Sequence, residues 1–242
     1  MKKLSIITIC LNEKNKIEKT INSVVSQSFN DFEYIIIDGG SSDGTVEVIS
    51  KFISKLSYFC SEKDNGIYSA MNKGIEHTHG EYLLFLNGGD YLNGNNVLQK
   101  IFQNMPNEDI IFGDLIFKES SSEESLKSFK DVKINKRYLY NFYIPHSASL
   151  IKRDLFLKYG LYNSHYKIAG DYEFFLRVIN KYKAIIRYIP VAISVFDTTG
   201  ISSDPKYFKL QIKERRRAQI QYFNYVFLFR MLLLKVRRVL FK

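Results

Sequence analysis

The sequence predicts an α/β fold in which helices cover a mostly parallel central sheet. Two apolar, β-branched runs at 4–10 and 32–38 are each followed by a segment whose apolar residues recur at helical spacing. A third run at 82–86 is apolar at every position, which is typical of a strand buried on both faces. Strands that alternate with helices favour parallel pairing through right-handed crossovers.

The other elements follow the same pattern along the chain. The spacing of Ile17, Ile21, Val24 and Val25 predicts the first helix, which Asn12 can cap. The pattern predicts further helices at 46–53, 67–77, 97–105 and 154–159, and another that begins at Asp171. Further strands are expected at 56–60, 110–114 and 185–196.

The bulk composition is that of an ordinary globular protein. A chain of 242 residues with 45% hydrophobic and 25% charged residues fits one domain with a substantial core. Cys10 and Cys60 lie in apolar, strand-like runs and are expected to be small buried hydrophobic residues. Because the two cysteines form no disulfide framework, the sequence indicates a reducing compartment.

The net charge of +10 lies in the C-terminal tail. Residues 205–242 hold eleven Lys and Arg against one acid, Glu214, whereas residues 1–204 balance 24 bases with 24 acids. The sequence therefore predicts a neutral domain at 1–204 and a basic tail at 205–242. A basic, aromatic-rich tail also allows a nucleic-acid binder, but the neutral domain carries no basic stripe and no specific nucleic-acid partner is expected.

The segment 225–242 predicts a basic amphipathic helix. Its cations interrupt the apolar run too often for the segment to span a bilayer. At about 100° per residue the cations fall within an arc of roughly 160°, opposite the apolar residues. The cations are Arg230, Lys235, Arg237, Arg238 and Lys242, and the apolar residues are Leu228, Phe229, Leu232, Leu233, Val236, Val239 and Leu240. Such a helix suits an anionic membrane surface, and packing on the domain or on a dimer partner is the alternative.

The apolar run at 82–86 ends in a polar corner, Asn87-Gly88-Gly89-Asp90. In open α/β sheets, ligands bind just beyond the carboxyl ends of the strands. The two glycines let the backbone approach a ligand, and Asp90 offers oxygens to a cation. A plain turn in which Asp90 caps its own backbone is the alternative.

A second polar loop, 38–45, follows the run at 32–38 and carries the carboxylates Asp38 and Asp43. Asp43 can cap the next helix, whereas Asp38 can accept hydrogen bonds from a base or a ribose. The loop has neither the Gly-x-Gly-x-x-Gly spacing nor a following Lys-Ser/Thr pair, so it is not a dinucleotide or P-loop fingerprint.

Four motifs in this order resemble the family 2 glycosyltransferases with the GT-A fold. They cover about the first 90 residues, namely 5–8 with Asn12 and Glu13, then 37–45, 64–74 and 85–90. The resemblance implies a Rossmann-like, three-layer α/β/α domain. It also implies an inverting transferase, of hexosyl type, that uses a nucleoside-diphosphate sugar. The subgroup that the motifs resemble assembles bacterial O-antigen (lipopolysaccharide), capsule and exopolysaccharide on lipid-linked glycan acceptors.

The resemblance also implies a donor site. Asp38 resembles the residue that reads the base, and Asn12 and Glu13 lie where the family holds the nucleoside. Asp90 resembles the carboxylate that meets a magnesium or manganese ion on the diphosphate, although Asn87 and Gly89 replace acids common in relatives. The other donor-binding residues that the resemblance implies are Thr8, Asn65, Gly66, Lys73, Asn87, Gly88, Gly89 and His146.

The segment 168–178, together with His146, continues the resemblance. Asp171 begins a helix, so a capping role would explain it from the residues alone. The resemblance implies that Asp171 is the catalytic base, which takes the proton of an acceptor hydroxyl within about 3 Å. His146 lines the site in relatives, and a core histidine with one satisfied nitrogen is the alternative.

Three hypotheses about function follow from the sequence. The first is an inverting glycosyltransferase, cytoplasmic and peripheral on the inner face of the plasma membrane, with a lipid-linked glycan acceptor. The second is a non-catalytic protein with the same fold, because acids are missing at Asn87 and Gly89. The third is the nucleic-acid binder.

Overall fold

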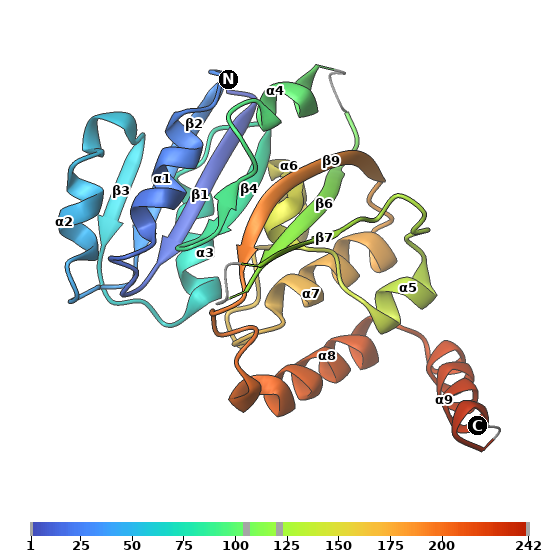
Figure 1. The fold of residues 1–242 in the computed structure, drawn as a ribbon. Helices are drawn as coiled ribbons and strands as arrows, with labels where there is room; N and C mark the ends of the chain where they lie inside the picture. The colour runs from blue at the N-terminus through green and yellow to red at the C-terminus, as the bar shows by residue number, and fades with distance from the viewer. Residues whose placement is uncertain (1, 104–106, 120–122, 241–242) are drawn as a thin grey trace.

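The computed structural model describes residues 2–103, 107–119 and 123–240, with residues 235–240 described by their backbone only. Within these residues, nine strands form one sheet, which helices cover on both faces (Figure 1). The strands are β1 (Leu4–Cys10), β2 (Phe32–Asp38), β3 (Tyr58–Ser61), β4 (Tyr82–Asn87), β5 (Tyr91–Leu92), β6 (Ile110–Lys118), β7 (Glu124–Lys127), β8 (Ser149–Lys152) and β9 (Ile186–Asp197). The helices are α1 (Ile17–Val25), α2 (Thr45–Ser50), α3 (Ile67–Glu76), α4 (Val97–Phe102), α5 (Lys136–Asn141), α6 (Arg153–Tyr159), α7 (Gly170–Phe175), α8 (Phe208–Tyr222) and α9 (Tyr225–Leu240).

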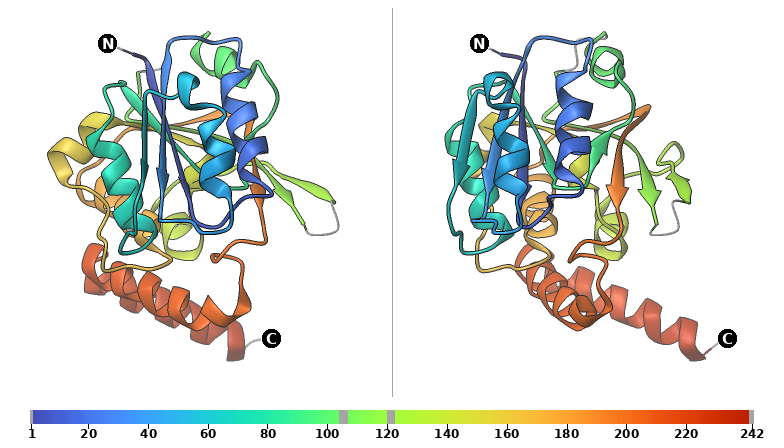
Figure 2. Two further views of the ribbon diagram at one scale, coloured as in Figure 1. Left: turned by 90° about the vertical axis from the view of Figure 1, so that its left-hand side faces the viewer. Right: turned by 60° about the vertical axis from the view of Figure 1, so that its left-hand side comes forward.

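Two apolar cores, one on each face of the sheet, give the domain three layers. Every residue of β1 is buried, and its side chains alternate between the cores. Ile7 and Ile9 pack with residues of α3, α6 and α7. Leu4 and Ile6 pack with residues of α1, α2 and α4 on the other face (Figure 2). The α/β architecture predicted from continuous apolar runs is therefore confirmed.

The sheet is mixed, in the order β3-β2-β1-β4-β8-β6-β9-β5 with β7 beside β6. Strands β3, β2, β1 and β4 pair in parallel, as the alternation of strands and helices predicted. The four-residue β8 then lies antiparallel between β4 and β6. Sequence reasoning missed β8 because four residues directly before a helix give too little periodicity to identify a strand.

Strand register brings several polar segments to one edge of the sheet. Asp38 pairs with Cys10 on one side and with Ser61 on the other. Asn87 pairs with Ile9 on the far side of β1. The turns after β1, β2, β3 and β4 therefore meet at the carboxyl ends of neighbouring strands, where α/β proteins bind ligands.

Helix α8 packs against the domain, below the carboxyl edge of the sheet (Figure 1). Glu214 is buried and accepts hydrogen bonds from the backbone N–H groups of Lys167, Ile168 and Ala169, at 2.8, 2.9 and 2.9 Å. Ala218, one turn further on, is fully buried. Residues beyond the predicted boundary at 204 thus contribute to the packing around α7.

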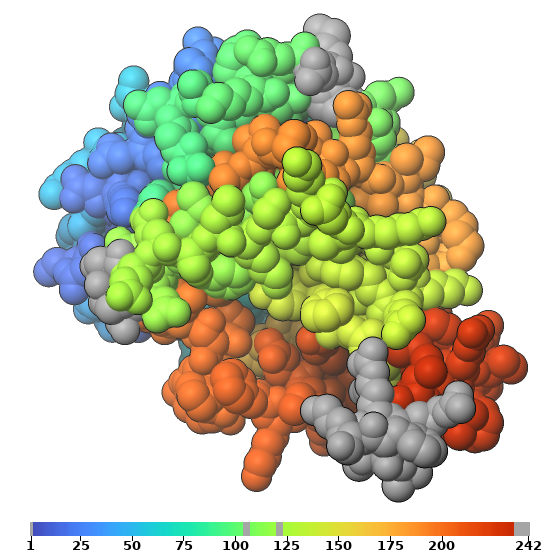
Figure 3. Space-filling model, turned by 45° about the vertical axis from the view of Figure 1, so that its right-hand side comes forward, coloured from blue at the N-terminus to red at the C-terminus, as the bar shows by residue number. Residues whose placement is uncertain are grey.

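Helix α9 follows α8 at one edge of the molecule, where its described atoms lie beside the segment that contains α5 (Figure 3). Phe227 of α9 packs against Tyr140 of α5, with 5.9 Å between the ring centroids. Met231 is buried, whereas Val226, Phe229, Leu232 and Leu233 are exposed. The C-terminal helix predicted at 225–242 is therefore present, with Arg230 among its described side chains. Other members of the predicted amphipathic pattern lie outside the described side chains: Lys235, Val236, Arg237, Arg238, Val239, Leu240 and Lys242. None of the helices in the described segments has both the length and the apolar character needed to cross a bilayer.

Candidate active site

A cavity of about 730 Å³ lies at the carboxyl ends of β1 and β4. Its walls include the turn after β1, the loop before α3, the start of α7, the segment after β9 and the side of α8. Seven residues that the sequence predicted for the site line this cavity, namely Glu13, Gly66, Asn87, Gly88, Asp90, His146 and Asp171. The structure therefore brings Asp171 to the same cavity as the corner after β4.

Six other predicted residues lie outside this lining in the described structure, namely Thr8, Asn12, Asp38, Asn65, Lys73 and Gly89. Thr8 is buried within β1, where its hydroxyl lies 2.9 Å from the hydroxyl of Tyr34. Lys73 forms an ion pair with Glu62 at 2.5 Å. The described contacts of Thr8 and Lys73 are thus with the protein's own side chains.

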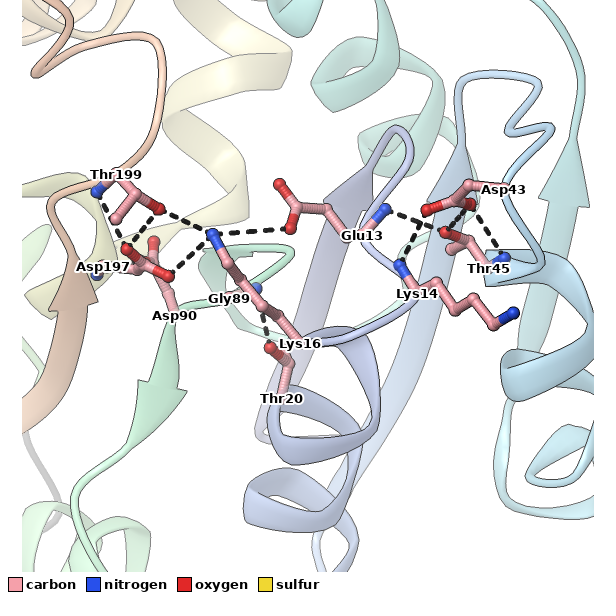
Figure 4. Close-up of polar contacts among 10 residues, drawn as sticks. All are labelled: Glu13, Lys14, Lys16, Thr20, Asp43, Thr45, Gly89, Asp90, Asp197 and Thr199. Atoms are coloured by element: carbon pink, nitrogen blue, oxygen red, sulfur yellow. Dashed lines mark hydrogen bonds and ion pairs between the residues drawn. The ribbon is translucent and has the colours of Figure 1, made fainter. Parts of the chain in front are cut away.

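Hydrogen bonds fasten the turn after β1 to the loop after β2. Asn12 has a left-handed φ of 55°, and its Oδ1 accepts the N–H of Ser42 at 3.0 Å. The N–H of Glu13 donates to Thr45 Oγ1 at 2.8 Å (Figure 4). Asp43 Oδ1 accepts the N–H of Thr45 at 3.0 Å, so it stabilises the first turn of α2. Asn12 and Asp43 thereby hold the wall that carries Glu13.

Asp171 lies at the start of α7 and faces the cavity. Its Oδ1 accepts the Tyr68 hydroxyl at 3.1 Å and the Tyr172 N–H at 2.8 Å. Its Oδ2 accepts a hydrogen bond from His146 Nδ1 at 3.1 Å. The residue that precedes α7 as its N-cap is Ala169, so Asp171 does not have the capping position. With 18% of its side chain exposed, Asp171 is held firmly yet remains accessible from the cavity.

His146, in the short turn η2 (His146–Ala148), connects Asp171 to the corner after β4. Its Nε2 lies 3.3 Å from the side-chain nitrogen of Asn87. That Asn87 amide also donates to Asp90 Oδ2 at 3.1 Å. Burial by itself would lower the pKa of His146, but the Asp171 hydrogen bond and the nearby Asp171 and Asp90 charges outweigh it and raise the pKa. His146 therefore couples the two carboxylates of the cavity.

Asp90 is a buried carboxylate whose two oxygens already accept hydrogen bonds. Only 2% of its surface is exposed. Oδ1 accepts the N–H of Asp197 at 3.0 Å, and Oδ2 accepts the N–H of Asn87 at 3.3 Å. Burial raises the pKa of Asp90 to about 6, against the opposing effect of these hydrogen bonds and of His146.

The predicted metal ion does not fit the side chains as they are arranged. Magnesium at a diphosphate is held by one or two accessible carboxylates, together with phosphate oxygens and waters. Asp90 is buried and each of its oxygens accepts hydrogen bonds from the protein, and Glu13 and Asp197 face the Lys16 ammonium instead. Within the described parts of the chain, no three His, Cys, Asp or Glu side chains converge on a possible metal position.

Lys16 lies beside the corner, with its ammonium between residues of two distant segments. Nζ lies 3.0 Å from Asp197 Oδ2, 2.6 Å from Thr199 Oγ1 and 3.8 Å from Glu13 Oε2 (Figure 4). Gly89 leaves room for this arrangement, because a Cβ there would lie 3.2 Å from Asp197 Oδ2 and 3.3 Å from Lys16 Cδ. Its φ of +109° also favours glycine.

Sequence reasoning missed Lys16, Tyr68 and Asp197 as members of the site. Asp197 directly follows the strand expected at 185–196, so its place at a strand end was a usable signal. Lys16 precedes α1 and Tyr68 lies in α3, where spacing alone predicts only a helix. Their proximity to the cavity depends on the pairing of β5 with β9 and on the position of α7, which local patterns do not contain.

The family profile described as Glycosyl transferase family 2 matches residues 5–160, which is more than half of the chain. The chain belongs to glycosyl transferase family 2. This family 2 chain is 29% identical over 203 residues to a PGL/p-HBAD biosynthesis glycosyltransferase of Mycobacterium tuberculosis, covering 81% of this chain and 77% of the relative. It is 31% identical over 206 residues to an uncharacterized glycosyltransferase of the same species, covering 83% and 77%.

Solved structures show that this transferase has a GT-A-like fold, as predicted. Staphylococcus aureus TarS 1–349 in complex with UDP-GlcNAc superposes with a TM-score of 0.69 at 18% identity, over 91% of this chain and 67% of that one. The mannosyltransferase PcManGT of Pyrobaculum calidifontis, in complex with GDP-Man and Mn²⁺, gives a TM-score of 0.60 at 16% identity, over 88% and 60%. The family 2 chain spans 36% of the longer TarS chain that it also matches.

Proposed function

We propose that this family 2 transferase moves a hexosyl group from a nucleoside-diphosphate sugar to an acceptor hydroxyl, with inversion at the anomeric carbon. The observation that supports this most directly is the Asp171 carboxylate facing a cavity of about 730 Å³. A cavity of this volume is in the range of small-molecule and cofactor sites. Inversion is consistent with the family and with direct displacement of the diphosphate by the acceptor oxygen.

Asp171 is the proposed general base. As the acceptor oxygen forms its bond to the anomeric carbon, its proton passes to the Asp171 carboxylate. The bond between the anomeric carbon and the diphosphate oxygen breaks on the opposite side, and the nucleoside diphosphate leaves. Tyr68 and His146 fix the two oxygens of Asp171, so the base is already oriented before the acceptor arrives.

Lys16 is the proposed partner of the leaving diphosphate. Its ammonium lines the cavity beside the Asn87–Asp90 corner, and 39% of its side chain is exposed. In the described structure it pairs with the Asp197 carboxylate, which phosphate oxygens could replace. A fixed cation next to a leaving group offsets the negative charge that develops as the bond breaks.

The substitution Asp171→Asn tests the proposed base. It should lower kcat by roughly a hundredfold or more, within the range for losing a general base. Donor affinity should barely change, because the amide is isosteric. The melting temperature should fall slightly, because the amide has one acceptor oxygen where the carboxylate accepts hydrogen bonds from both Tyr68 and His146. Asp154→Asn, an exposed acid on α6, is the matched control. Unchanged turnover in Asp171→Asn would place the base elsewhere.

The proposed acceptor is a lipid-linked glycan of surface polysaccharide biosynthesis, in the O-antigen, capsule and exopolysaccharide subgroup. The mycobacterial relative is named for PGL/p-HBAD biosynthesis, so its name supports glycosyl transfer and leaves this subgroup a proposal. The exposed apolar residues of α9, with the basic charge after residue 204, suit peripheral attachment to the anionic inner face of the plasma membrane.

The magnesium or manganese ion expected at Asp90 stays a prediction, although a solved structure of similar fold contains Mn²⁺ with GDP-Man. Donor affinity measured by calorimetry in EDTA and in manganese, at equal ionic strength, tests it. Equal affinity in both conditions would show that donor binding needs no metal.

A further inference from the structure

Helix α8 presents one face to the cavity, beside the start of α7. Phe208, Gln211 and Arg215 lie at i, i+3 and i+7 in this helix, and all three line the cavity. Glu214 and Ala218 are buried and fasten α8 to the domain. Helix α8 therefore supports α7 and also contributes side chains to the cavity.

Arg215 is a cation without an acidic partner. Its Cζ lies 4.6 Å from the ring centroid of Tyr172, the residue that follows Asp171. Its Nη2 donates to the carbonyl oxygens of Asn141 and Phe142, at 3.3 and 3.2 Å. Among the described residues, no Asp or Glu side chain forms an ion pair with Arg215. These contacts orient the guanidinium and leave its charge available to a ligand in the cavity.

A second cation without an acidic partner, Lys127 of β7, borders the cavity. Its Nζ lies 4.8 Å from the ring centroid of Tyr143 and 5.8 Å from that of Phe117, and both rings line the cavity. Burial lowers the pKa of Lys127, and no ion pair of Lys127 is found in the described part of the chain. Burial and the Asp171 charge raise the pKa of Tyr143, whereas the Arg215 charge opposes this rise, so Tyr143 lies within reach of both groups. An anion bound near Tyr143 would supply the counter-charge that both cations lack.

Arg215 is placed for the acceptor and not for the leaving diphosphate. In the described structure, the polar contacts of Lys16, the proposed partner of the diphosphate, involve none of the residues that contact Arg215. In a displacement with inversion, the acceptor oxygen and the diphosphate lie on opposite sides of the anomeric carbon. Because Asp171 is the proposed base for the acceptor hydroxyl, a cation over the adjacent Tyr172 ring lies near the acceptor.

We propose that Arg215, together with Lys127, binds a phosphate group of the acceptor, and that this phosphate joins the accepting sugar to a lipid. This inference rests on the proposed transferase function. The planar guanidinium matches phosphate oxygens with two parallel N–H groups, and the Lys127 ammonium can neutralise further negative charge. Exposed apolar side chains of Ile201 and Phe208 line the same cavity and suit the hydrocarbon beside such a phosphate. The two cations therefore select an acceptor that is both anionic and apolar.

Binding of geranyl phosphate and geraniol to the full-length chain, measured by calorimetry, tests the proposal. The wild type should bind geranyl phosphate about tenfold or more tightly than geraniol, because hydrogen bonds to charged groups have about this effect. Arg215→Gln should remove this preference. Lys127→Gln, which leaves the contacts of Arg215 intact, should weaken geranyl phosphate several-fold. Arg216→Gln, which removes an exposed charge from the same helix, should change neither affinity.

Affinities for UDP, GDP, CDP and dTDP, measured with the same variants, separate this inference from the proposed function. The nucleotide that the wild type binds should bind Arg215→Gln equally well. If that nucleotide loses as much affinity as geranyl phosphate does, Arg215 serves the donor and the inference is overturned. Unchanged geranyl phosphate affinity in both Arg215→Gln and Lys127→Gln also overturns it, as does methyl phosphate binding as tightly as geranyl phosphate. If the wild type binds none of the four nucleotides, the proposed transferase function itself fails, whatever its affinity for geranyl phosphate.

Discussion

At the scale of single residues, the site depends on how each carboxylate is oriented by its neighbours. Asp38, Asp90 and Asp171 all lie near the carboxyl edge of the sheet. Protein donors engage both oxygens of Asp38 and of Asp90, and both residues are almost fully buried. Asp171 is also hydrogen-bonded, yet it faces the cavity and remains partly exposed. Exposure toward the cavity, more than residue type, therefore distinguishes the candidate base from a structural acid.

The hydroxyl of Tyr68 should matter for catalysis because it holds Asp171 Oδ1. The hydroxyl oxygen of Tyr68 lies within hydrogen-bond distance of two acceptors, 2.7 Å from Ile168 O and 3.1 Å from Asp171 Oδ1. Tyr68→Phe should lower kcat several-fold and leave donor affinity nearly unchanged, at a stability cost of about 1 kcal/mol. Tyr162→Phe is the matched control, because the Tyr162 hydroxyl is buried without a hydrogen-bond partner in the described structure. Steady-state kinetics that show equal losses in both variants would contradict a positioning role for Tyr68.

At the scale of elements, short segments carry the functional side chains and longer ones support them. Helix α7 has six residues and continues directly into a π-helical segment, Leu176–Lys181. Helix α8 supports α7 through two side chains. Glu214 accepts hydrogen bonds from the loop that precedes α7, and Gln219 Nε2 donates to the Tyr172 hydroxyl at 3.0 Å. The position of Asp171 therefore depends on a helix that begins more than 30 residues later in the chain.

Glu214→Ala should lower kcat although Glu214 does not line the cavity. It removes the acceptor of three backbone N–H groups that directly precede α7. Unpaired buried donors cost about 1–3 kcal/mol, so the melting temperature should fall as well. Arg216→Ala, an exposed site on the same helix, should change neither quantity. A variant that melts earlier but retains full kcat in its folded fraction would show that Glu214 acts on stability alone.

Glu33 should make a pH-dependent contribution to stability at the other end of β2. Its Oε1 accepts the Ser5 hydroxyl at 2.5 Å and the Gly80 N–H at 3.0 Å. Burial by itself would raise the pKa of Glu33, but the hydrogen bonds from Ser5, His79 and Gly80 outweigh it and lower the pKa below 4.5. A lowered acid pKa stabilises the fold above the unfolded value, and this contribution is lost as pH falls through the folded value.

Chemical denaturation of Glu33→Gln and wild type therefore has a defined outcome. At pH 7 the wild type should be more stable by about 1–3 kcal/mol. The difference should shrink steadily as the pH falls below 4.5. Glu81→Gln, which removes a surface ion pair with Lys3, should show a difference of less than about 1 kcal/mol. A difference for Glu33→Gln that is constant with pH would mean that its charge makes no contribution.

At the scale of the whole molecule, the sequence predicted what local patterns contain. The strands β1, β2 and β4 and the corner at Asn87–Asp90 followed from apolar runs that end in polar turns. The mixed sheet did not follow, because β8 is four residues long. Seven site residues were found because each belongs to a recognisable motif. Lys16 and Asp197 were not predicted as site residues, because their contact depends on the pairing of β5 with β9.

Deletion of residues 225–242 should move the protein from anionic liposomes to the soluble fraction without abolishing donor binding. Basic residues near an anionic surface contribute about 1 kcal/mol each. The exposed side chains of Val226, Phe229, Leu232 and Leu233 add an apolar contribution. Flotation at low and high salt, with neutral liposomes as the control, measures the liposome-bound fraction of the full-length and the truncated protein. If the full-length protein does not bind anionic liposomes, or if the truncated protein aggregates, α9 is a packing or dimer element.

The contact between Lys16 and Thr199 joins residues that are 183 positions apart in the chain. A protein synthesised from its N-terminus can pair β1, β2 and β4 early, because these strands are close in sequence. The two walls of the cavity can meet only after β9 has emerged, and Asp171 gains its support only after α8 has followed. Most of the chain must therefore leave the ribosome before the active site is complete, and a truncated product from interrupted translation would have no assembled catalytic centre.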